Sequence, residues 1–273
     1  MKLSFNTWCY CSFPAWLPAY PIDYVIKSLA KIGYDGVELG CASPVAYPPY
    51  MTTADREAVR RLLKENKIEI SSVLPAPGGG CGNNVASPLS AERKQAIQSY
   101  KECVDLAADL GAKICLYVAG WVIYGVDQDQ AWEWSRECLV EVARHAKTRG
   151  VTIAVEPTPA DSNLVETPDD ALKLMAETRM DNVKVMFDTI HALYRKDNPA
   201  DYVDKMGSHL AHVHISDLER MPPGTYTDFS FVVDALKANG YKGYLAMEIG
   251  LGGRGIDCNG FAKRALENMK KYL

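Results

Sequence analysis

The sequence contains few histidines and no excess of basic residues. Its five histidines all lie at or after position 145, so the first half of the chain offers no imidazole to a metal centre. Lys and Arg number 30 against 34 Asp and Glu, which gives a net charge of −4 and an isoelectric point of about 5.8. Proteins that bind nucleic acids usually present a basic face, so we expect no nucleic-acid partner.

Long apolar runs are also absent. No apolar segment approaches the roughly 20 residues that a membrane-spanning helix needs, so we expect no membrane partner. The N-terminal segment MKLSFNTWCYCSF lacks the basic stretch and apolar core of a secretory signal. We therefore expect a cytoplasmic protein. Its eight scattered cysteines are expected to be free thiols in that reducing compartment.

Two glycine-rich motifs of nucleotide-binding proteins are missing as well. An open sheet that binds dinucleotides carries a glycine-rich turn after its first strand, whereas here CYCSFP follows at positions 9–14. The segment Pro75–Asn84, PAPGGGCGNN, lacks the Lys-Ser/Thr ending of a phosphate-binding loop. We expect a flexible loop there, and an active-site lid is the alternative interpretation.

Short runs rich in β-branched residues alternate along the chain with longer amphipathic segments. This alternation is typical of repeated βα units around a parallel sheet. The expected strands are Leu3–Trp8, Gly36–Leu39, Ile68–Val73, Lys113–Val118, Val151–Glu156, Val183–Asp188, Leu210–Ser216 and Tyr244–Ile249. The expected helices are Ile22–Ile32, Ala54–Lys64, Ala91–Leu110, Gln130–Arg149, Pro168–Glu177, Pro199–Met206, Phe229–Asn239 and Gly260–Tyr272.

Eight strands and eight helices fit either a closed barrel or an open doubly wound sheet. The 273 residues divide evenly into eight units of about 34, close to the size of one βαβ repeat. Because the dinucleotide motif is missing too, the pattern favours the barrel, which typically needs about 250 residues. We therefore expect an α/β fold, a (β/α)8 TIM barrel in which residues 1–273 form one domain.

Each of the last four expected strands has an acid or an imidazole at or near its end. Glu156 ends VTIAVE, Asp188 ends VKVMFD, His214 lies in LAHVHIS, and Glu248 lies in YLAMEI. The active site of a TIM barrel lies at the carboxyl ends of its strands. These four side chains are therefore expected to converge.

Three carboxylates and one imidazole in apolar surroundings need a cation, because an unpaired buried carboxylate costs several kcal/mol. We expect one divalent metal bound by Glu156, Asp188, His214 and Glu248. The oxygen-rich set favours Mn²⁺ or Mg²⁺, with Co²⁺ or Zn²⁺ as alternatives. Taken singly, Glu156 could face solvent, Asp188 could cap a helix, and His214 could be a core histidine. Four such residues at the ends of four consecutive strands favour a metal site over these separate explanations.

Further polar residues flank this set. His191 and Arg220 are expected over the barrel mouth, where they would hydrogen-bond substrate oxygens. Asn163 is a candidate support for the metal ligands, and Glu38, at the end of the second strand, is a weaker candidate site residue. His212 has the same parity as His214 but lies one pleat deeper, so we interpret it as a supporting or core residue.

These motifs resemble the xylose-isomerase-like TIM barrel superfamily, and most of all its D-tagatose/D-psicose 3-epimerase group. The resemblance covers essentially the whole chain. The motifs that carry it are Gly33–Glu38, Val155–Pro157, Phe187–His191, His212–Arg220 and Met247–Ile249. The spacings of Asp188 to His191 and of His214 to Arg220 point most narrowly to the ketose 3-epimerases.

The resemblance implies roles for individual residues. Glu156 and Glu248 would be both metal ligands and the catalytic acid/base pair, whereas His191 and Arg220 would bind substrate oxygens near C2. The sugar 3-epimerases commonly place another Glu six residues after the first metal ligand, but Ser162 stands here. This departure leaves the identity of the sugar open.

The expected reaction is epimerisation of a ketose at C3 through an enediolate, because a metal beside two carboxylates suits proton transfer next to a carbonyl. The same site suits an aldose–ketose, keto-inositol or hydroxypyruvate-type isomerase, or an inosose dehydratase. A non-catalytic carbohydrate-binding barrel is a more distant alternative. An apurinic-site nuclease is disfavoured because its zinc centre needs histidines from the first half of the barrel. Barrels of this group are often homo-dimers or homo-tetramers, so we expect self-association.

Overall fold

The structure is a computed structural model that describes residues 1–11, 19–43, 45–76, 83–251 and 256–273. Only the ends of the glycine-rich segment Pro75–Asn84 belong to these ranges. The hypothesis of a lid therefore concerns residues 77–82, which lie outside the described residues.

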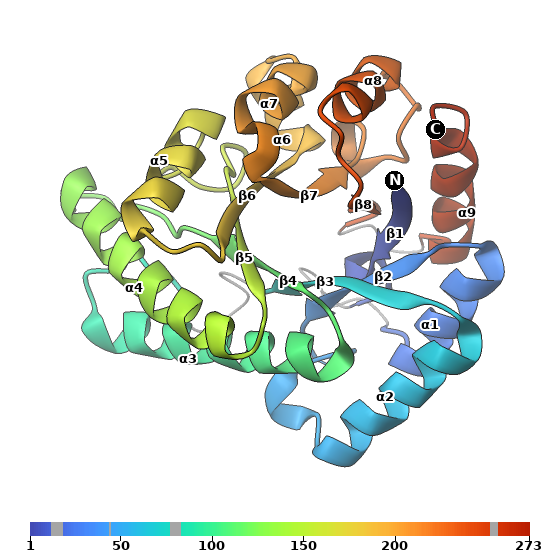
Figure 1. The fold of residues 1–273 in the computed structure, drawn as a ribbon, viewed down its shortest axis with the longest axis horizontal. Coiled ribbons are helices and arrows are strands. Elements are labelled where there is room, and N and C mark those ends of the chain that lie inside the picture. The colour runs from blue at the N-terminus through green and yellow to red at the C-terminus, as the bar shows by residue number, and fades with distance from the viewer. Residues whose placement is uncertain (12–18, 44, 77–82, 252–255) are drawn as a thin grey trace.

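Eight parallel strands form a closed barrel in chain order (Figure 1). Each strand pairs with its sequence neighbours, and β1 closes the barrel by pairing with β8. The strands are β1 Lys2–Asn6, β2 Gly36–Cys41, β3 Glu69–Pro75, β4 Ile114–Val118, β5 Thr152–Glu156, β6 Val183–Asp188, β7 Leu210–Ile215 and β8 Tyr244–Met247. The predicted (β/α)8 barrel is confirmed.

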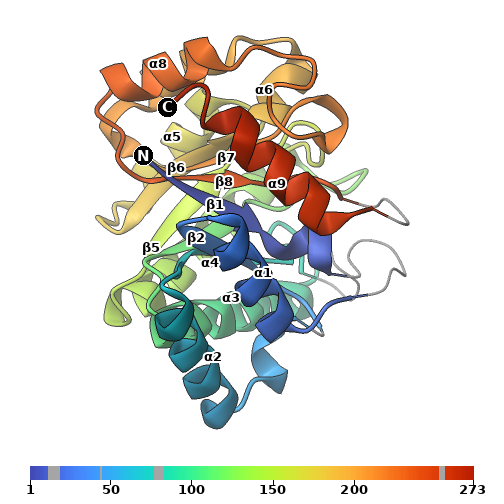
Figure 2. The ribbon, with the colours of Figure 1, turned by 90° about the vertical axis from the view of Figure 1, so that its right-hand side faces the viewer.

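Helices surround the barrel on the outside, and Figure 2 shows α9 beside α1 on the flank that covers β1. The α-helices are α1 Ile22–Ile32, α2 Thr53–Asn66, α3 Ser90–Leu110, α4 Gln128–Thr148, α5 Pro168–Thr178, α6 Thr189–Arg195, α7 Pro199–Met206, α8 Ser230–Ala238 and α9 Cys258–Met269. Short 3-10 helices are η1 Thr7–Tyr10, η2 Pro48–Tyr50, η3 Gly207–His209 and η4 Leu218–Arg220. No helix within the described ranges is long and apolar enough to cross a membrane.

Local capping explains where the structure departs from the expected elements. The first strand ends at Asn6 rather than Trp8, because the Asn6 side chain accepts a hydrogen bond from Trp8 N and starts η1. The helix α6 is not among the helices expected from the sequence. This helix follows β6 without a loop because the Asp188 side chain caps it, accepting from Ile190 N at 3.0 Å.

The carboxyl end of the barrel is polar inside, although apolar side chains fill much of the core. By register, Asn6 is level with Glu38, Glu38 with Ser72, and Asp188 with His214. All of these side chains are buried. Buried polar groups require hydrogen-bond or ionic partners, so this end of the barrel is where a functional site is expected.

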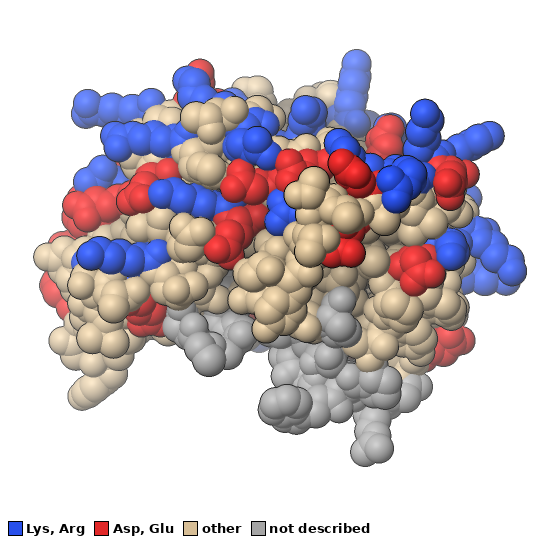
Figure 3. Space-filling view, turned by 90° about the horizontal axis from the view of Figure 1, so that it is seen from below, with Lys and Arg blue, Asp and Glu red and all other residues tan. Residues whose placement is uncertain are grey.

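Charged side chains are spread unevenly over the surface. On the face shown in Figure 3, Lys and Arg gather toward the top, and most of the described residues below them are uncharged. Exposed aromatic residues follow the carboxyl ends of the strands instead. Examples are Tyr50 after β2, Tyr124 after β4 and Tyr226 after β7.

Candidate active site

Four consecutive strands bring the four predicted ligands together. Glu156 and Asp188 are the last residues of β5 and β6, His214 is the penultimate residue of β7, and Glu248 directly follows β8. The Nδ1 atom of His214 lies 3.2 Å from Glu248 Oε2, 3.8 Å from Glu156 Oε1 and 4.0 Å from Asp188 Oδ2. All four side chains are buried.

Three of the four predicted ligands form one group that could hold a divalent cation, whereas Glu156 falls in a second group with Asp188 and His191. Asp188, His214 and Glu248 each offer a ligand atom within 4.8 Å of the others. Ligands held at roughly 2.0–2.3 Å from an ion lie at comparable separations from one another. Both ring nitrogens of His214 are buried without a hydrogen bond among the described residues, although Glu38 faces Nε2 and the carboxylate cluster faces Nδ1. An imidazole nitrogen in that position is suited to metal ligation.

Arg220 reaches the cluster from the segment after β7. Its Nη1 atom contacts Asp188 Oδ2 and lies 2.7 Å from Glu248 Oε2. The guanidinium therefore lies against two of the predicted ligands rather than only over the mouth. Arg220 is not itself a plausible ligand, because a guanidinium has donors and no acceptor.

A strained backbone carries Arg220 into the site. Glu219 and Arg220 have φ values of 58° and 56°, which place both in the left-handed region that costs non-glycine residues about 1–2 kcal/mol each. Buried Asp217 anchors this segment, because its carboxylate accepts from Tyr226 N at 2.7 Å and Thr227 N at 2.9 Å. These bonds hold the two residues in the strained conformation.

His191 lies on α6 beside the first glutamate. Its Nε2 is 3.8 Å from Glu156 Oε1 and 3.7 Å from Asp161 Oδ2, and its Nδ1 accepts from Ala160 N at 3.4 Å. Burial lowers the pKa of His191 below its ordinary value. The imidazole is therefore expected to be neutral near pH 7, with its Nε2–H directed toward the site.

The surroundings push the pKa values of two carboxyl groups in opposite directions. Burial raises the pKa of Glu156 well above its usual value. Burial also disfavours the charged form of Asp188, but Arg220 and His214 outweigh it and lower that pKa. The two carboxyl groups therefore lie in electrostatically different surroundings within the same cluster.

Beneath the cluster, Glu38 is the centre of a buried polar network. Its Oε1 accepts from Asn6 Nδ2 at 2.6 Å and lies 2.7 Å from His214 Nε2. Its Oε2 accepts from Ser72 Oγ at 2.5 Å and bonds His212 Nε2 at 2.7 Å. Asn6 and Ser72 are not among the site residues expected from the sequence. The feature that could have identified them is their position in the alternation of inward- and outward-facing residues along each strand. Both align in register with Glu38 on the neighbouring strands.

The segment after β5 is organised differently from the expectation. Asn163 accepts from Val122 N at 2.8 Å and donates to Val122 O at 3.2 Å. Asn163 therefore ties together the segments that follow β4 and β5, and the expectation that it supports the metal ligands is wrong. Ser162, at the position where the resemblance anticipates a glutamate, bonds Thr158 Oγ1 at 2.7 Å.

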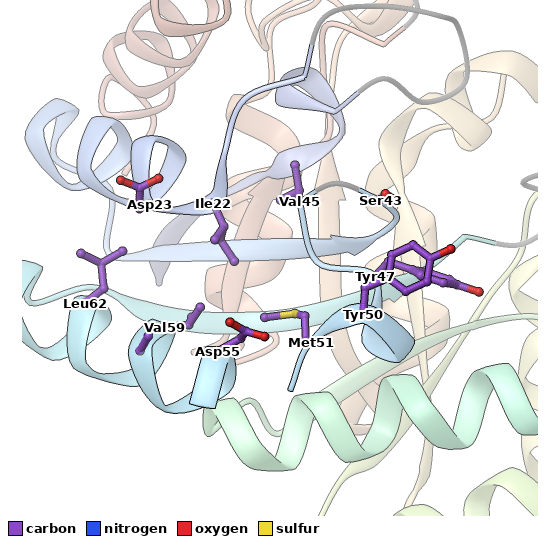
Figure 4. A pocket seen from close by; sticks show the side chains of 11 residues that line it. Ile22, Asp23, Ser43, Val45, Tyr47, Tyr50, Met51, Asp55, Val59 and Leu62 are labelled. Carbon is purple, nitrogen blue, oxygen red and sulfur yellow. The ribbon is translucent and has the colours of Figure 1, made fainter. Parts of the chain in front are cut away.

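A separate cavity of about 480 Å³ lies between α1, α2 and the segment around η2 (Figure 4). Its walls include Ile22, Val59 and Leu62, with Tyr47 and Tyr50 at one side. None of its lining residues belongs to the carboxylate cluster or to the Glu38 network. We therefore assign it no part in the candidate active site.

Comparisons with known proteins agree with this architecture. A curated relative, fructoselysine 3-epimerase from Shigella flexneri, is 24% identical over 236 residues, which cover 84% of this chain and 85% of that enzyme. D-psicose 3-epimerase from Ruminiclostridium cellulolyticum is 28% identical over 82% of this chain and 77% of its own length.

Solved structures show the same fold. A crystal structure of D-psicose 3-epimerase from Clostridium cellulolyticum H10 with D-tagatose superposes with a TM-score of 0.83 at 22% identity. The superposition covers 100% of this chain and 98% of that chain. The family model described as xylose isomerase-like TIM barrel matches residues 26–271. The chain therefore belongs to the xylose isomerase-like TIM barrel family.

Proposed function

We propose that the protein is a divalent-metal-dependent enzyme that epimerises a ketose at C3. The observation that carries this proposal is the placement of two buried glutamates, from β5 and β8, within 3.8 Å and 3.2 Å of the same imidazole nitrogen. The similarity to enzymes named fructoselysine 3-epimerase and D-psicose 3-epimerase supports it. The substrate would be a small-molecule sugar.

In this proposal Glu156 and Glu248 form the acid/base pair. One carboxylate removes the proton from C3, and the electron pair of the broken C–H bond moves toward the carbonyl to give an enediolate. The other glutamate, protonated, returns a proton to the opposite face of C3, which inverts its configuration. The roles exchange in the reverse direction, as general acid–base catalysis requires.

The four residues Glu156, Asp188, His214 and Glu248 would hold the metal ion. A bound divalent cation would supply Lewis-acid polarisation of the ketose carbonyl. We propose Mn²⁺ because three of the four side chains offer oxygen, and Mg²⁺, Co²⁺ and Zn²⁺ are the alternatives.

His191 and Arg220 are proposed to bind the substrate. The neutral His191 Nε2–H can donate to a sugar oxygen beside Glu156, because the two side chains lie within 3.8 Å of each other. Arg220 bridges Asp188 and Glu248, so its remaining N–H groups can donate to oxygens of a sugar bound above them.

Solvent isotope incorporation tests the reaction. Turnover of D-fructose or D-psicose in D₂O should place deuterium at C3 of the product, because a carboxylic acid proton exchanges with solvent. Nuclear magnetic resonance of the product locates the label. Deuterium at C1 or C2 with formation of an aldose would identify an aldose–ketose isomerase. Loss of water from an inosose would identify a dehydratase.

We also propose that the protein forms a homo-dimer or homo-tetramer. Tyr50, Tyr124 and Tyr226, on the carboxyl side of the barrel, have exposed fractions of 72%, 104% and 63%. Large exposed apolar side chains that gather on one side of a protein often mark an interface. Light scattering should give a mass of two or four times 30.1 kDa, and a mass of one chain would contradict this proposal.

Two broader proposals concern the whole chain. We propose that residues 1–273 form one domain, because the first and last strands pair along Lys2–Phe5 and Tyr244–Met247 and so share one sheet. A cytoplasmic location is also proposed. It is supported by the free, buried state of the seven cysteines within the described ranges.

A further inference from the structure

Glu38 has an unusual environment for a carboxylate. It is fully buried, and each of its oxygens has two polar partners within 2.7 Å. Asn6, Ser72, His212 and His214 supply these partners from β1, β3 and β7. An isolated buried charge would be strongly destabilising, so this carboxylate depends on its four partners. The proposed acid/base chemistry does not use Glu38, which leaves its role to be explained.

The contact with His214 suggests what Glu38 does. A neutral imidazole carries its proton on one ring nitrogen and is an acceptor or a metal ligand at the other. Glu38 Oε1 lies 2.7 Å from Nε2 and Glu248 Oε2 lies 3.2 Å from Nδ1, both at ion-pair distance without hydrogen-bond geometry. A carboxylate next to Nε2 favours the proton on that nitrogen, which leaves the Nδ1 lone pair directed into the carboxylate cluster.

Asn6 extends this network to a second ligand. Its Nδ2 donates to Glu38 Oε1 at 2.6 Å and lies 3.5 Å from Glu248 Oε1. Its Oδ1 accepts from Trp8 N at 2.7 Å, which fixes the orientation of the amide. The same group therefore touches the carboxylates of β2 and β8.

We propose that Glu38 is a positioning residue that holds His214 in the Nε2–H form with Nδ1 directed at the metal ligands, and that Asn6 couples it to Glu248. This inference rests on the proposed function, because it assigns a role within the same site. It concerns metal binding by the chain's own residues and does not depend on which sugar reaction follows.

Metal affinity is the first measurement. In Glu38→Gln the side-chain NH₂ group would face groups that donate hydrogen bonds to the carboxylate in the wild type. Two donors cannot bond each other, so His214 would lose its fixed orientation. We expect titration calorimetry with Mn²⁺ alone to show a dissociation constant raised by about 10- to 100-fold. Glu69→Gln is the matched control, because Glu69 lies at the opposite end of the barrel on β3 and pairs with exposed Lys2. This control should bind Mn²⁺ as the wild type does.

The tautomer of His214 is the second measurement, and a merely structural role would not change it. Spectra of ¹⁵N-histidine-labelled protein kept free of metal with a chelator should show His214 protonated at Nε2 in the wild type. Glu38→Gln should lose or mix that form. Nδ1–H on His214 in the wild type would overturn the proposal without any variant. Unchanged affinity and tautomer in Glu38→Gln would also overturn it.

A second variant keeps the test decisive if Glu38→Gln does not fold. Glu38→Asp keeps the charge but shortens the reach, so we expect Mn²⁺ binding to weaken by about 3- to 10-fold. Wild-type affinity in this variant, with His214 still protonated at Nε2, would then count against the proposal. A wild-type protein that binds Mn²⁺ but converts no ketose would overturn the proposed function and leave this inference standing.

Discussion

The carboxyl groups of Glu156 and Glu248 have different neighbours within the same buried cluster. Glu248 Oε2 accepts from Arg220 Nη1 at 2.7 Å, whereas the described groups that face Glu156 Oε1 are the imidazoles of His191 and His214, each at 3.8 Å. Burial accordingly raises the pKa of Glu156. The two members of the proposed acid/base pair therefore differ in their contacts.

Replacing either glutamate by glutamine tests the acid/base assignment. Glu156→Gln and Glu248→Gln should each lower kcat by at least about 10²-fold, because an amide cannot transfer the proton. Steady-state kinetics with saturating Mn²⁺ and a ketose measure the effect. Glu166→Gln is the control, since Glu166 lies outside the cluster and pairs with Arg195 at 3.7 Å. Either site variant with wild-type kcat would contradict the assignment.

Asp188 combines two functions that substitutions can separate. Its Oδ1 caps α6 by accepting from Ile190 N at 3.0 Å, and its Oδ2 faces the cluster. Asp188→Asn keeps an acceptor for the cap, so thermal stability should remain close to wild type while Mn²⁺ affinity falls by at least about tenfold. Asp188→Ala should lose affinity and also about 1 kcal/mol of unfolding free energy, the usual contribution of an N-cap. Equal stability of the two variants would show that the cap contributes little.

At the scale of the element, the segment after β7 positions Arg220 through Asp217. The Asp217 carboxylate accepts from Leu218 N at 2.9 Å and also from Tyr226 N and Thr227 N, so one buried side chain links positions 218 to 227 of the segment. Gly250 N adds a link from the end of β8 by donating to Arg220 O at 2.9 Å. The strained backbone at Arg220 therefore depends on contacts made elsewhere in the segment.

Removal of this anchor should affect both stability and catalysis. Asp217→Ala leaves backbone N–H groups without their acceptor, so we expect the unfolding free energy to fall by about 1–3 kcal/mol. We also expect a lower kcat/KM, because Arg220 loses its support. Chemical denaturation and kinetics measure the two effects. Asp234→Ala, on the exposed face of α8, is the control and should stay within about 0.5 kcal/mol of wild type. Wild-type kinetics in Asp217→Ala would show that Arg220 is positioned by other contacts.

At the scale of the whole molecule, the proposed metal-binding cluster joins the four strands of the second half of the barrel. Its proposed ligands, on β5, β6 and β7 and directly after β8, come from positions 156 to 248, so an ion bound there would link elements that are far apart in the chain. Binding to the folded chain alone stabilises it by mass action. The proposed site therefore predicts a metal-dependent stability.

Melting curves with and without metal provide the measurement. At about 100 times its dissociation constant, Mn²⁺ should add ~2.7 kcal/mol, which corresponds to a rise in Tm of roughly 5–10 °C for a chain of this size. A chelator should reverse the rise, and Asp188→Asn should show a smaller one. A Tm that does not respond to Mn²⁺, Mg²⁺, Co²⁺ or Zn²⁺ would contradict the proposed metal site.

The order of elements could be predicted because it depends on local patterns. The six-residue strand β6, for example, has the bounds expected from the sequence. Its mostly apolar run indicates a strand, and the acid that follows the run indicates where the strand ends. The short helix α6 could not be found in the same way. It begins directly at Asp188, so no loop separates its pattern from the strand before it.

The sequence by itself determined the barrel and the residues that meet at its mouth, because strand periodicity and strand ends are properties of short segments. Only the tertiary structure decided which side chains support and contact those residues. Asn6 bonds Glu38 across 32 positions and Glu38 bonds His212 across 174, and Arg220 turns back onto Asp188. These partners lie on strands and segments that come together only when the barrel closes, so no local pattern could reveal the contacts between them.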